Sequence, residues 1–244
     1  MSNSIVEIED TKCLFIFGYN ASTSHPIVAR RINRAKEKGA KIIVCDPRKI
    51  ETARVADIYA PLKNGSNVAF LNAMMNVIIE ENLVDQTFID EHTENFEQMY
   101  EVVKDYTPES TQHITGIGPA MLREIARTYA TAETATILWG MGVCQFRQGV
   151  EAVRSLASIA MLTGNLGKPN VGVNPVRGQN NVQGACDMGA LYNTLPGYQR
   201  LDDPTTMEKF AKAWGVDSLN TKPGVPLSDC LLYTSDAADD PSKV

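Results

Sequence analysis

The sequence contains few of the residues that build metal clusters or disulfide frameworks. Its 244 residues include five cysteines, which is an odd number, and three scattered histidines, and no two cysteines form a CxxC pair. These counts exclude a zinc ribbon and an iron–sulfur binding run within this chain, and they fit free thiols better than a disulfide framework. We therefore expect free thiols, a reducing compartment, and no metal ligand supplied by this segment.

Long apolar runs and an excess of basic charge are also absent. No stretch is long enough to cross a bilayer as a helix, and the first residues, MSNSIVEIED, have neither the basic nor the apolar region of a secretory signal. The net charge of −6 argues against general nucleic-acid binding, which requires a basic face. The apolar share of 43% is ordinary for a soluble chain. We expect a cytoplasmic protein with one large domain and part of another, no membrane span and no nucleic-acid partner.

Short apolar runs alternate with helical patterns along the first two thirds of the chain. Four runs have the composition of strands buried on both faces: 13–17, 41–45, 57–62 and 136–139. Helical spacing covers the segments 26–38, 68–78, 87–91, 96–104, 119–131 and 148–162, and Ser24 can cap the first of them. This alternation predicts an α/β fold with a doubly wound, mostly parallel Rossmann-like sheet and helices on both faces.

Glycine, amide or acidic residues follow these runs at each predicted carboxyl end. Because the carboxyl ends of parallel strands meet at one edge of a sheet, we expect one extended ligand site there. The first turn, Gly18-Tyr19-Asn20, lacks the GxGxxG pattern, so we expect a nucleotide other than NAD. Asp46 follows the second run, where a carboxylate binds hydroxyls or a guanine edge; the alternative is a plain helix cap. Asn64-Gly65-Ser66-Asn67 opens a helix and favours an anion, although such turns also serve as simple connections.

The segment from Asn174 to Gly189, NPVRGQNNVQGACDMG, has few apolar residues, three glycines, several amides and one arginine. Such a composition builds neither a core strand nor a good helix, so we expect a loop. Loops rich in glycine and donors let the backbone approach a polar ligand closely. The alternative is a long surface loop without a ligand.

This segment closely resembles the loop that closes over the molybdenum centre in formate dehydrogenases of the molybdopterin oxidoreductase family. The resemblance continues, in the family's order, through FGYNASTSHPIVAR, KIIVCDPRKIETA, LKNGSN, ILWGMGVCQF and MLTGNLGKPNVGVNPVRG, and spans roughly residues 1 to 220. It implies an oxidoreductase of anaerobic metabolism that oxidises formate to carbon dioxide. It also implies a bis-molybdopterin guanine dinucleotide that carries molybdenum or tungsten.

The resemblance assigns cofactor contacts to each turn and to the loop. The implied contacts are Gly18, Asn20, Ser24, Cys45, Asp46, Arg48, Leu62, Gly65, Asn67, Gly140, Met141, Gly142, Gln145, Gly178 and Gln179. Arg48 would pair bidentately with the diphosphate. Arg177 is the implied catalytic residue, which would face the molybdenum and clamp the carboxylate of formate. Cys186 is expected to be structural, because the family's metal ligand precedes everything in this sequence.

The resemblance also predicts that the chain is an internal fragment. The family's cysteine motif for a [4Fe–4S] cluster and its metal-ligating segment do not occur in the sequence, so the isolated chain is expected to be inactive. Electron-transfer or hydrogenase subunits are the expected partners of the parent enzyme. Two alternatives remain open, namely another molybdopterin oxidoreductase such as a nitrate reductase, and a non-redox nucleotide-binding module.

Three regions are expected along the chain. Residues 1–179 would form the α/β domain that binds the molybdopterin guanine dinucleotide, and residues 180–229 the loop and the start of a second, cofactor-binding α/β domain. Residues 230–244, CLLYTSDAADDPSKV, resemble a translated transposase adapter from DNA library preparation and are expected to be non-native. The alternative for this last region is a genuine polar tail.

Overall fold

A computed structural model describes residues 1–226 and 229–230 of the chain. The chain divides into two units, Met1–Gly178 and a second that begins at Gln179, which is one residue from the predicted boundary. Apart from Cys230, the predicted non-native tail lies outside the described residues. The roles expected of the two regions in cofactor binding remain predictions.

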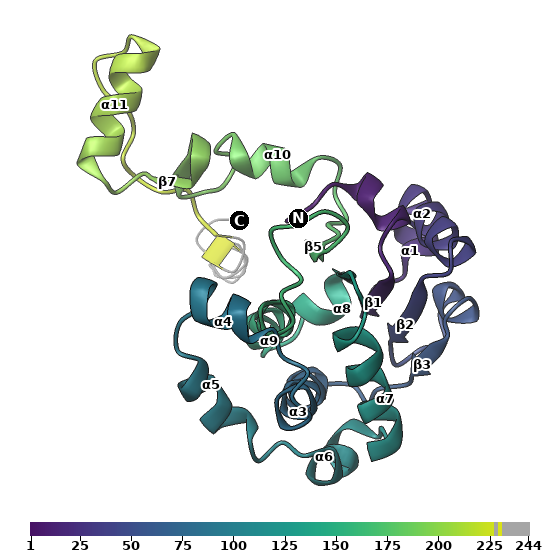
Figure 1. The fold of residues 1–244 in the computed structure, drawn as a ribbon. Coiled ribbons are helices and arrows are strands. Elements are labelled where there is room, and N and C mark those ends of the chain that lie inside the picture. Colours follow the sequence, from purple (N-terminus) through teal and green to yellow (C-terminus); the bar gives the residue numbers. More distant parts are fainter. Residues whose placement is uncertain (227–228, 231–244) are drawn as a thin grey trace, which may run out of the picture. The chain divides into compact units, whose positions relative to one another are not determined.

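The first unit is built on a five-stranded parallel sheet (Figure 1). Its strands are β1 (Cys13–Phe17), β2 (Lys41–Cys45), β3 (Ile58–Ala60), β4 (Ala135–Trp139) and β5 (Gly172–Pro175). They lie in the order β3-β2-β1-β4-β5, and each neighbouring pair is parallel. The chain extends the sheet from β1 toward β3 and then returns to add β4 and β5 on the other side of β1. The topological switch point therefore lies between β1 and β4.

One short helix precedes β1, and further helices connect the strands. They are η1 (Ile5–Glu9), α1 (Ala21–Ser24), α2 (Pro26–Glu37), η2 (Glu51–Arg54), α3 (Asn67–Glu80), α4 (Gln86–His92), α5 (Phe96–Val103), α6 (Pro108–Thr115), α7 (Pro119–Ala130), α8 (Met141–Cys144) and α9 (Gly149–Leu162). Proline is the first residue of α2, α6 and α7, where its missing N–H would have no helical partner in any case. Among the described residues, no helix is long and apolar enough to span a membrane.

Alternate residues of the central strands supply two cores, one on each face of the sheet. In β2, Ile42 and Val44 pack with residues of α2, whereas Ile43 and Cys45 belong to the larger core with α3, α7 and α9. Successive side chains of a strand point to opposite faces, so a strand covered on both faces reads as a continuous apolar run. The predicted doubly wound α/β fold, with helices on both faces, is confirmed.

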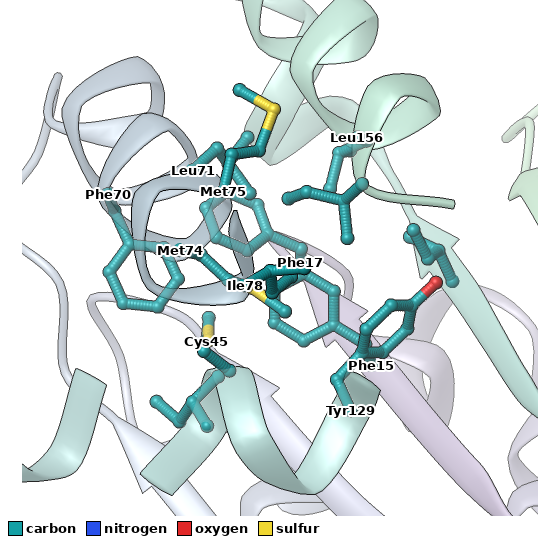
Figure 2. Packing of buried hydrophobic residues seen from close by; sticks show 14 of the residues in the cluster. Phe15, Phe17, Cys45, Phe70, Leu71, Met74, Met75, Ile78, Tyr129 and Leu156 are labelled. Atoms are coloured by element: carbon teal, nitrogen blue, oxygen red, sulfur yellow. The ribbon is translucent and has the colours of Figure 1, made fainter. Parts of the chain in front are cut away.

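Helix α3 is the centre of the larger core (Figure 2). All its residues from Phe70 to Ile78 are buried, because α5, α6, α7 and α9 surround it. Two of these buried residues are polar, and both are hydrogen-bonded. Asn76 Nδ2 donates to the carbonyls of Val103 and Lys104, and Asn72 Oδ1 accepts from Ser155 Oγ at 3.2 Å. Satisfied amides of this kind avoid the penalty for burying a polar group and fix the helix against its neighbours.

Two local predictions are wrong. The segment 174–189 is not a continuous loop, because Asn174 and Pro175 end β5 and α10 (Val182–Asp187) follows. Strand β5 forms because β4 offers it an edge, so tertiary pairing overrides a composition that disfavours strands. Ser24 does not cap α2; it ends α1, and His25 is the N-cap without a side-chain cap bond. The fixed φ of Pro26 determines where α2 begins.

The second unit combines helices with a small sheet in its described part. Its elements after α10 are β6 (Thr194–Leu195), η3 (Pro196–Tyr198), β7 (Gln199–Arg200) and α11 (Pro204–Trp214), and the two strands pair antiparallel. Asp203 caps α11 by accepting a hydrogen bond from the backbone N–H of Thr205, and Gly215 ends the helix with φ of 66°.

The position of α3 predicts where the fold is most sensitive to truncation. Leu71 is fully buried in this helix, so Leu71→Ala should lower the free energy of unfolding by about 2–5 kcal/mol. Ile27, which is 66% exposed on α2, provides the control. Ile27→Ala should change the free energy of unfolding by less than about 0.5 kcal/mol. Urea denaturation of both variants measures the difference, and equal effects would contradict the assigned core.

Candidate functional site

A cleft of about 400 Å³ lies where the strands of the first unit end. Gly18 follows β1, Asp46 follows β2, Leu62 lies just beyond β3 and Gly140 follows β4, and all four line the cleft. The region after β5 contributes Val176 and Gly178. The cleft therefore occupies the carboxyl edge of the sheet and includes the switch point, which is where open α/β sheets bind ligands.

Hydrogen bonds link three of the turns that form the cleft. The N–H of Gly18 donates to the carbonyl of Cys45 at 2.9 Å, and the N–H of Gly142 donates to the carbonyl of Gly18 at 3.1 Å. Asn67 Nδ2, at the start of α3, donates to the carbonyl of Gly142 at 3.3 Å. The turns after β1 and β4 and the start of α3 are thus fixed to one another, so the cleft is preformed.

The turns after β1 and β4 cross so closely that both require glycine. A Cβ atom on Gly142 would lie 2.7 Å from the carbonyl oxygen of Gly18 and 2.9 Å from its Cα. A Cβ on Gly18 would lie 2.8 Å from the carbonyl carbon of Gly142, and Gly18 also has φ of 56°, in the left-handed region. Neither contact is compatible with a larger residue in this backbone arrangement.

Asp46 is a half-buried carboxylate at the end of β2. Burial raises the pKa of Asp46, against the opposing effects of the Arg48 backbone N–H and the Arg48 charge. That N–H donates to Asp46 Oδ1 at 2.8 Å. After burial, the Asp46 charge is the second cause that raises the pKa of Tyr59. Desolvation disfavours the ionised form of Asp46. A ligand that donates hydrogen bonds to the carboxylate would replace the solvation that burial removes.

Three polar atoms of residues that line the cleft are buried without a hydrogen-bond partner among the described residues. They are the hydroxyl of Tyr19, Oδ1 of Asn20 and Nδ1 of His25. Burial raises the pKa of Tyr19, so its hydroxyl stays protonated and can donate. A buried polar group without a partner costs about 1–3 kcal/mol, which a polar ligand would recover.

Cys45 lines the cleft, but its side chain belongs to the larger core (Figure 2). Burial, and after it the charge of Asp46, raise the pKa of the Cys45 thiol, which therefore stays protonated. A protonated thiol is a poor metal ligand. Within the part of the chain that the structure describes, no cluster of three or more histidine, cysteine, aspartate or glutamate residues could hold a metal ion.

The structure brings most of the predicted cofactor residues together along this cleft. The lining includes Gly18, Asn20, Ser24, Cys45, Asp46, Arg48, Leu62, Asn67, Gly140, Met141, Gly142 and Gly178. Four predicted site residues do not line it. Gly65 lies in the turn before α3, Gln145 follows α8 as its C-cap, and Arg177 is exposed between the lining residues Val176 and Gly178. Gln179 begins the second unit.

Seven lining residues were not predicted from the sequence. They are Phe17, Tyr19, His25, Pro47, Asn64, Phe146 and Val176. Most are immediate neighbours of predicted residues, so treating each turn as a whole would have found them. His25 differs, because its Nε2 lies 2.7 Å from the carbonyl oxygen of Arg177, and only the folded chain shows this contact.

A parallel sheet with a preformed cleft at its switch point defines a doubly wound α/β protein, a fold that binds its ligands at this place. The sequence comparison identifies the family, since residues 1–230 match the molybdopterin oxidoreductase family. The chain belongs to this family, and the resemblance predicted from the sequence is confirmed. A search of solved structures finds acetylene hydratase from Pelobacter acetylenicus, with a TM-score of 0.61 and 28% sequence identity over 66% of this chain and 24% of that chain.

Several curated relatives are formate dehydrogenases by name. The chain is 64% identical to formate dehydrogenase H of Escherichia coli (strain K12), over 94% of this chain and 32% of the relative. It is 50% identical to F420-dependent formate dehydrogenase 1 subunit alpha of Methanococcus maripaludis, over 95% of this chain and 34% of the relative. A nitrate reductase of Synechocystis is 35% identical, over 90% of this chain and 31% of the relative. The chain spans about a third of the length of these relatives.

The crossing of the two glycine turns generates a stability prediction. Gly142→Ala should lower the free energy of unfolding by about 1–3 kcal/mol, because the new methyl group would overlap the Gly18 backbone. Gly178→Ala is a matched control in the same cleft, since a Cβ there meets nothing within 4 Å. Thermal and urea unfolding of both variants measure the effect. Equal stability of the Gly142→Ala variant and the unsubstituted chain would show that the turns do not cross this closely.

Proposed function

We propose that the chain is part of a molybdenum-dependent formate dehydrogenase that oxidises formate to carbon dioxide. The observation that carries this proposal is the 64% identity to formate dehydrogenase H over 94% of the chain. The lower identity of 35% to a nitrate reductase favours formate over nitrate as the substrate. A stand-alone nucleotide-binding module without redox chemistry is disfavoured by the family itself. Recovering the reading frame around this segment, with its cluster and metal-ligand motifs, tests that distinction.

We propose that the cleft holds a molybdopterin guanine dinucleotide. Three features support the fit, namely the side-chain-free backbone at Gly18 and Gly142, the unpartnered polar atoms of Tyr19 and Asn20, and the desolvated carboxylate of Asp46. The cofactor, with molybdenum or tungsten, supplies two-electron redox chemistry when bound. Gly65, Gln145 and Gln179 complete the proposed contacts, and the paired second dinucleotide and the [4Fe–4S] cluster would depend on other parts of the parent enzyme.

Asp46 and Arg48 have complementary roles in this proposal. The Asp46 carboxylate can accept the paired N–H donors of a guanine edge or a ribose hydroxyl, and Arg48 can donate a bidentate pair of hydrogen bonds to the diphosphate. The two residues are already joined through the Arg48 N–H and Asp46 Oδ1. Their spacing is therefore set by a short turn just beyond β2, and not by flexible side chains alone.

Arg177 is proposed to bind formate. It is exposed and follows Val176, which is buried and whose N–H donates to the carbonyl of Trp139 at 2.9 Å. The planar guanidinium can hold both oxygens of a carboxylate, which fixes the direction of the formate C–H bond. Breaking that bond would yield carbon dioxide, one proton and two electrons, and the cofactor would supply the two-electron acceptor.

The parent enzyme is proposed to act in anaerobic metabolism in the cytoplasm and to pass its electrons to other subunits. The name of the Methanococcus relative describes that protein as a subunit alpha, which indicates companion chains in that enzyme. Electron-transfer or hydrogenase subunits are the partners we propose for this one. Co-purification of the full-length parent with its neighbouring gene products tests this assignment.

Substitution of Arg177 tests the substrate site. In the full-length parent, Arg177→Lys should lower kcat/KM for formate. The fall should correspond to a loss of about 2–4 kcal/mol of transition-state stabilisation, because lysine cannot hold both carboxylate oxygens in one plane. Molybdenum content should stay normal. Arg30→Lys, at an exposed position of α2, provides the matched control and should leave the kinetics unchanged. An unchanged kcat/KM for Arg177→Lys would remove Arg177 from the substrate site.

Substitution of Asp46 tests the cofactor site separately from stability. Asp46→Asn keeps the acceptor for the Arg48 N–H but removes the charge, so dinucleotide binding in the parent should weaken by about 1–3 kcal/mol. The raised pKa means that the folded state holds this proton more tightly than the unfolded state does. The stability contributed by Asp46 is therefore lost as pH rises through its folded pKa. At pH 7 the thermal midpoint of the variant should be no lower than that of the parent.

Pterin and molybdenum analysis, together with the thermal midpoint, measures both effects of Asp46→Asn. Asp105→Asn changes an exposed carboxylate between α5 and α6 and serves as the control. Full cofactor occupancy in a stable Asp46→Asn variant would mean that Asp46 only shapes its turn.

A further inference from the structure

His25 occupies a rigid position beside the cleft, between α1 and α2. Its N–H donates to the carbonyl of Ala21 at 2.8 Å, and its own carbonyl accepts from the N–H of Ala29 at 3.0 Å. Pro26 follows it and restricts its backbone, which has φ of −143° and ψ of 73°. The His25 side chain therefore projects from a point that two helices fix.

The His25 ring bridges this point to the segment after β5. Nε2 lies 2.7 Å from the carbonyl oxygen of Arg177, and a carbonyl can only accept, so Nε2 carries the proton and donates. The ring of Tyr19 packs against the His25 ring, with 5.5 Å between their centroids. Nδ1 is buried and has no hydrogen-bond partner among the described residues. The ring is thus held in one orientation and one tautomer.

The hydrogen bond between His25 and the Arg177 carbonyl lies at the point where the chain leaves the sheet. Val176 is still anchored, because its N–H donates to the carbonyl of Trp139. Gly178 follows Arg177 in open surroundings, where a Cβ would meet nothing within 4 Å. His25 therefore holds the peptide that joins Arg177 to Gly178, at the transition from a packed segment to an open one.

We propose that His25 is a positioning residue for Arg177, an inference that rests on the proposed role of Arg177 in binding formate. By fixing the Arg177 carbonyl, His25 fixes the peptide plane next to the Arg177 Cα and so the direction in which the guanidinium leaves the chain. Without this bond the side chain would start from several backbone positions. A bidentate contact tolerates little displacement, so formate would bind more weakly and in more orientations. His25 itself need not touch the substrate.

Two substitutions separate the hydrogen bond from the packing of the ring. His25→Phe keeps a ring against Tyr19 and removes the donor, whereas His25→Gln keeps a donor and removes the ring. In the full-length parent, His25→Phe should raise KM for formate about tenfold with a smaller fall in kcat, as expected for the loss of one hydrogen bond. His25→Gln should recover most of this loss. His113→Phe, at an exposed histidine of α6, is the control and should behave as the parent does.

Non-additivity distinguishes positioning from general destabilisation. If His25 acts through Arg177, His25→Phe should change formate kinetics by less than about twofold in an Arg177→Ala background. If the kinetic effects of the two substitutions multiply in the double variant, the proposal is overturned. It is also overturned if His25→Phe alone leaves the kinetics normal, or if the activity falls only in proportion to a reduced molybdenum or pterin content. If Arg177→Ala alone leaves the kinetics unchanged, the proposed role of Arg177 fails, and the inference about His25 fails with it.

The tautomer gives a readout that does not depend on activity. Long-range proton–nitrogen NMR spectra of the purified chain should show the His25 proton on Nε2. In Arg177→Ala, which retains the backbone carbonyl, the same tautomer should persist. A proton on Nδ1 in the parent chain would overturn the proposal, because the ring could then not donate to Arg177.

Discussion

The contact on which the site depends is the crossing of two turns at the switch point of the sheet. Gly18 and Gly142 approach to the limit that two backbones allow, and a hydrogen bond between them fixes the distance. Asn67 adds the start of α3 to the same network. Because these turns follow fully buried strands, the rigidity of the core is transmitted to the cleft, which can then hold a polar ligand without first ordering its own backbone.

The sequence predicted the elements whose burial is uniform. Runs 13–17 and 41–45 coincide with β1 and β2, since strands covered on both faces are apolar almost throughout, and only Lys41 at the start of β2 is exposed. The glycine and amide turns were equally readable, because residues that follow buried strands of one parallel sheet must meet at one edge. Most of the predicted cofactor residues therefore line a single cleft, although their contacts with the dinucleotide remain predictions.

What the sequence did not show depends on partners far away in the chain. The composition of Gly172–Pro175 disfavours a strand, yet the open edge of β4 makes it one. His25 reads as an ordinary residue before a proline, and its contact with the Arg177 carbonyl arises only when α2 and β5 are in place. No local pattern encodes such a pair, because the two residues lie on elements that the sheet brings together.

The strand order also has a consequence for how the cleft is assembled during folding. β1 pairs with β4, from Cys13↔Ala135 to Phe17↔Trp139, across all of the chain that forms β2, β3 and helices α1 to α7. Contacts between residues so distant in sequence cost more loop-closure entropy than local contacts and tend to form more slowly. The half of the sheet that contains β1, β2 and β3 can close through shorter connections. We therefore expect the turn after β4 to join the cleft later in folding than the turns that follow β1 and β2.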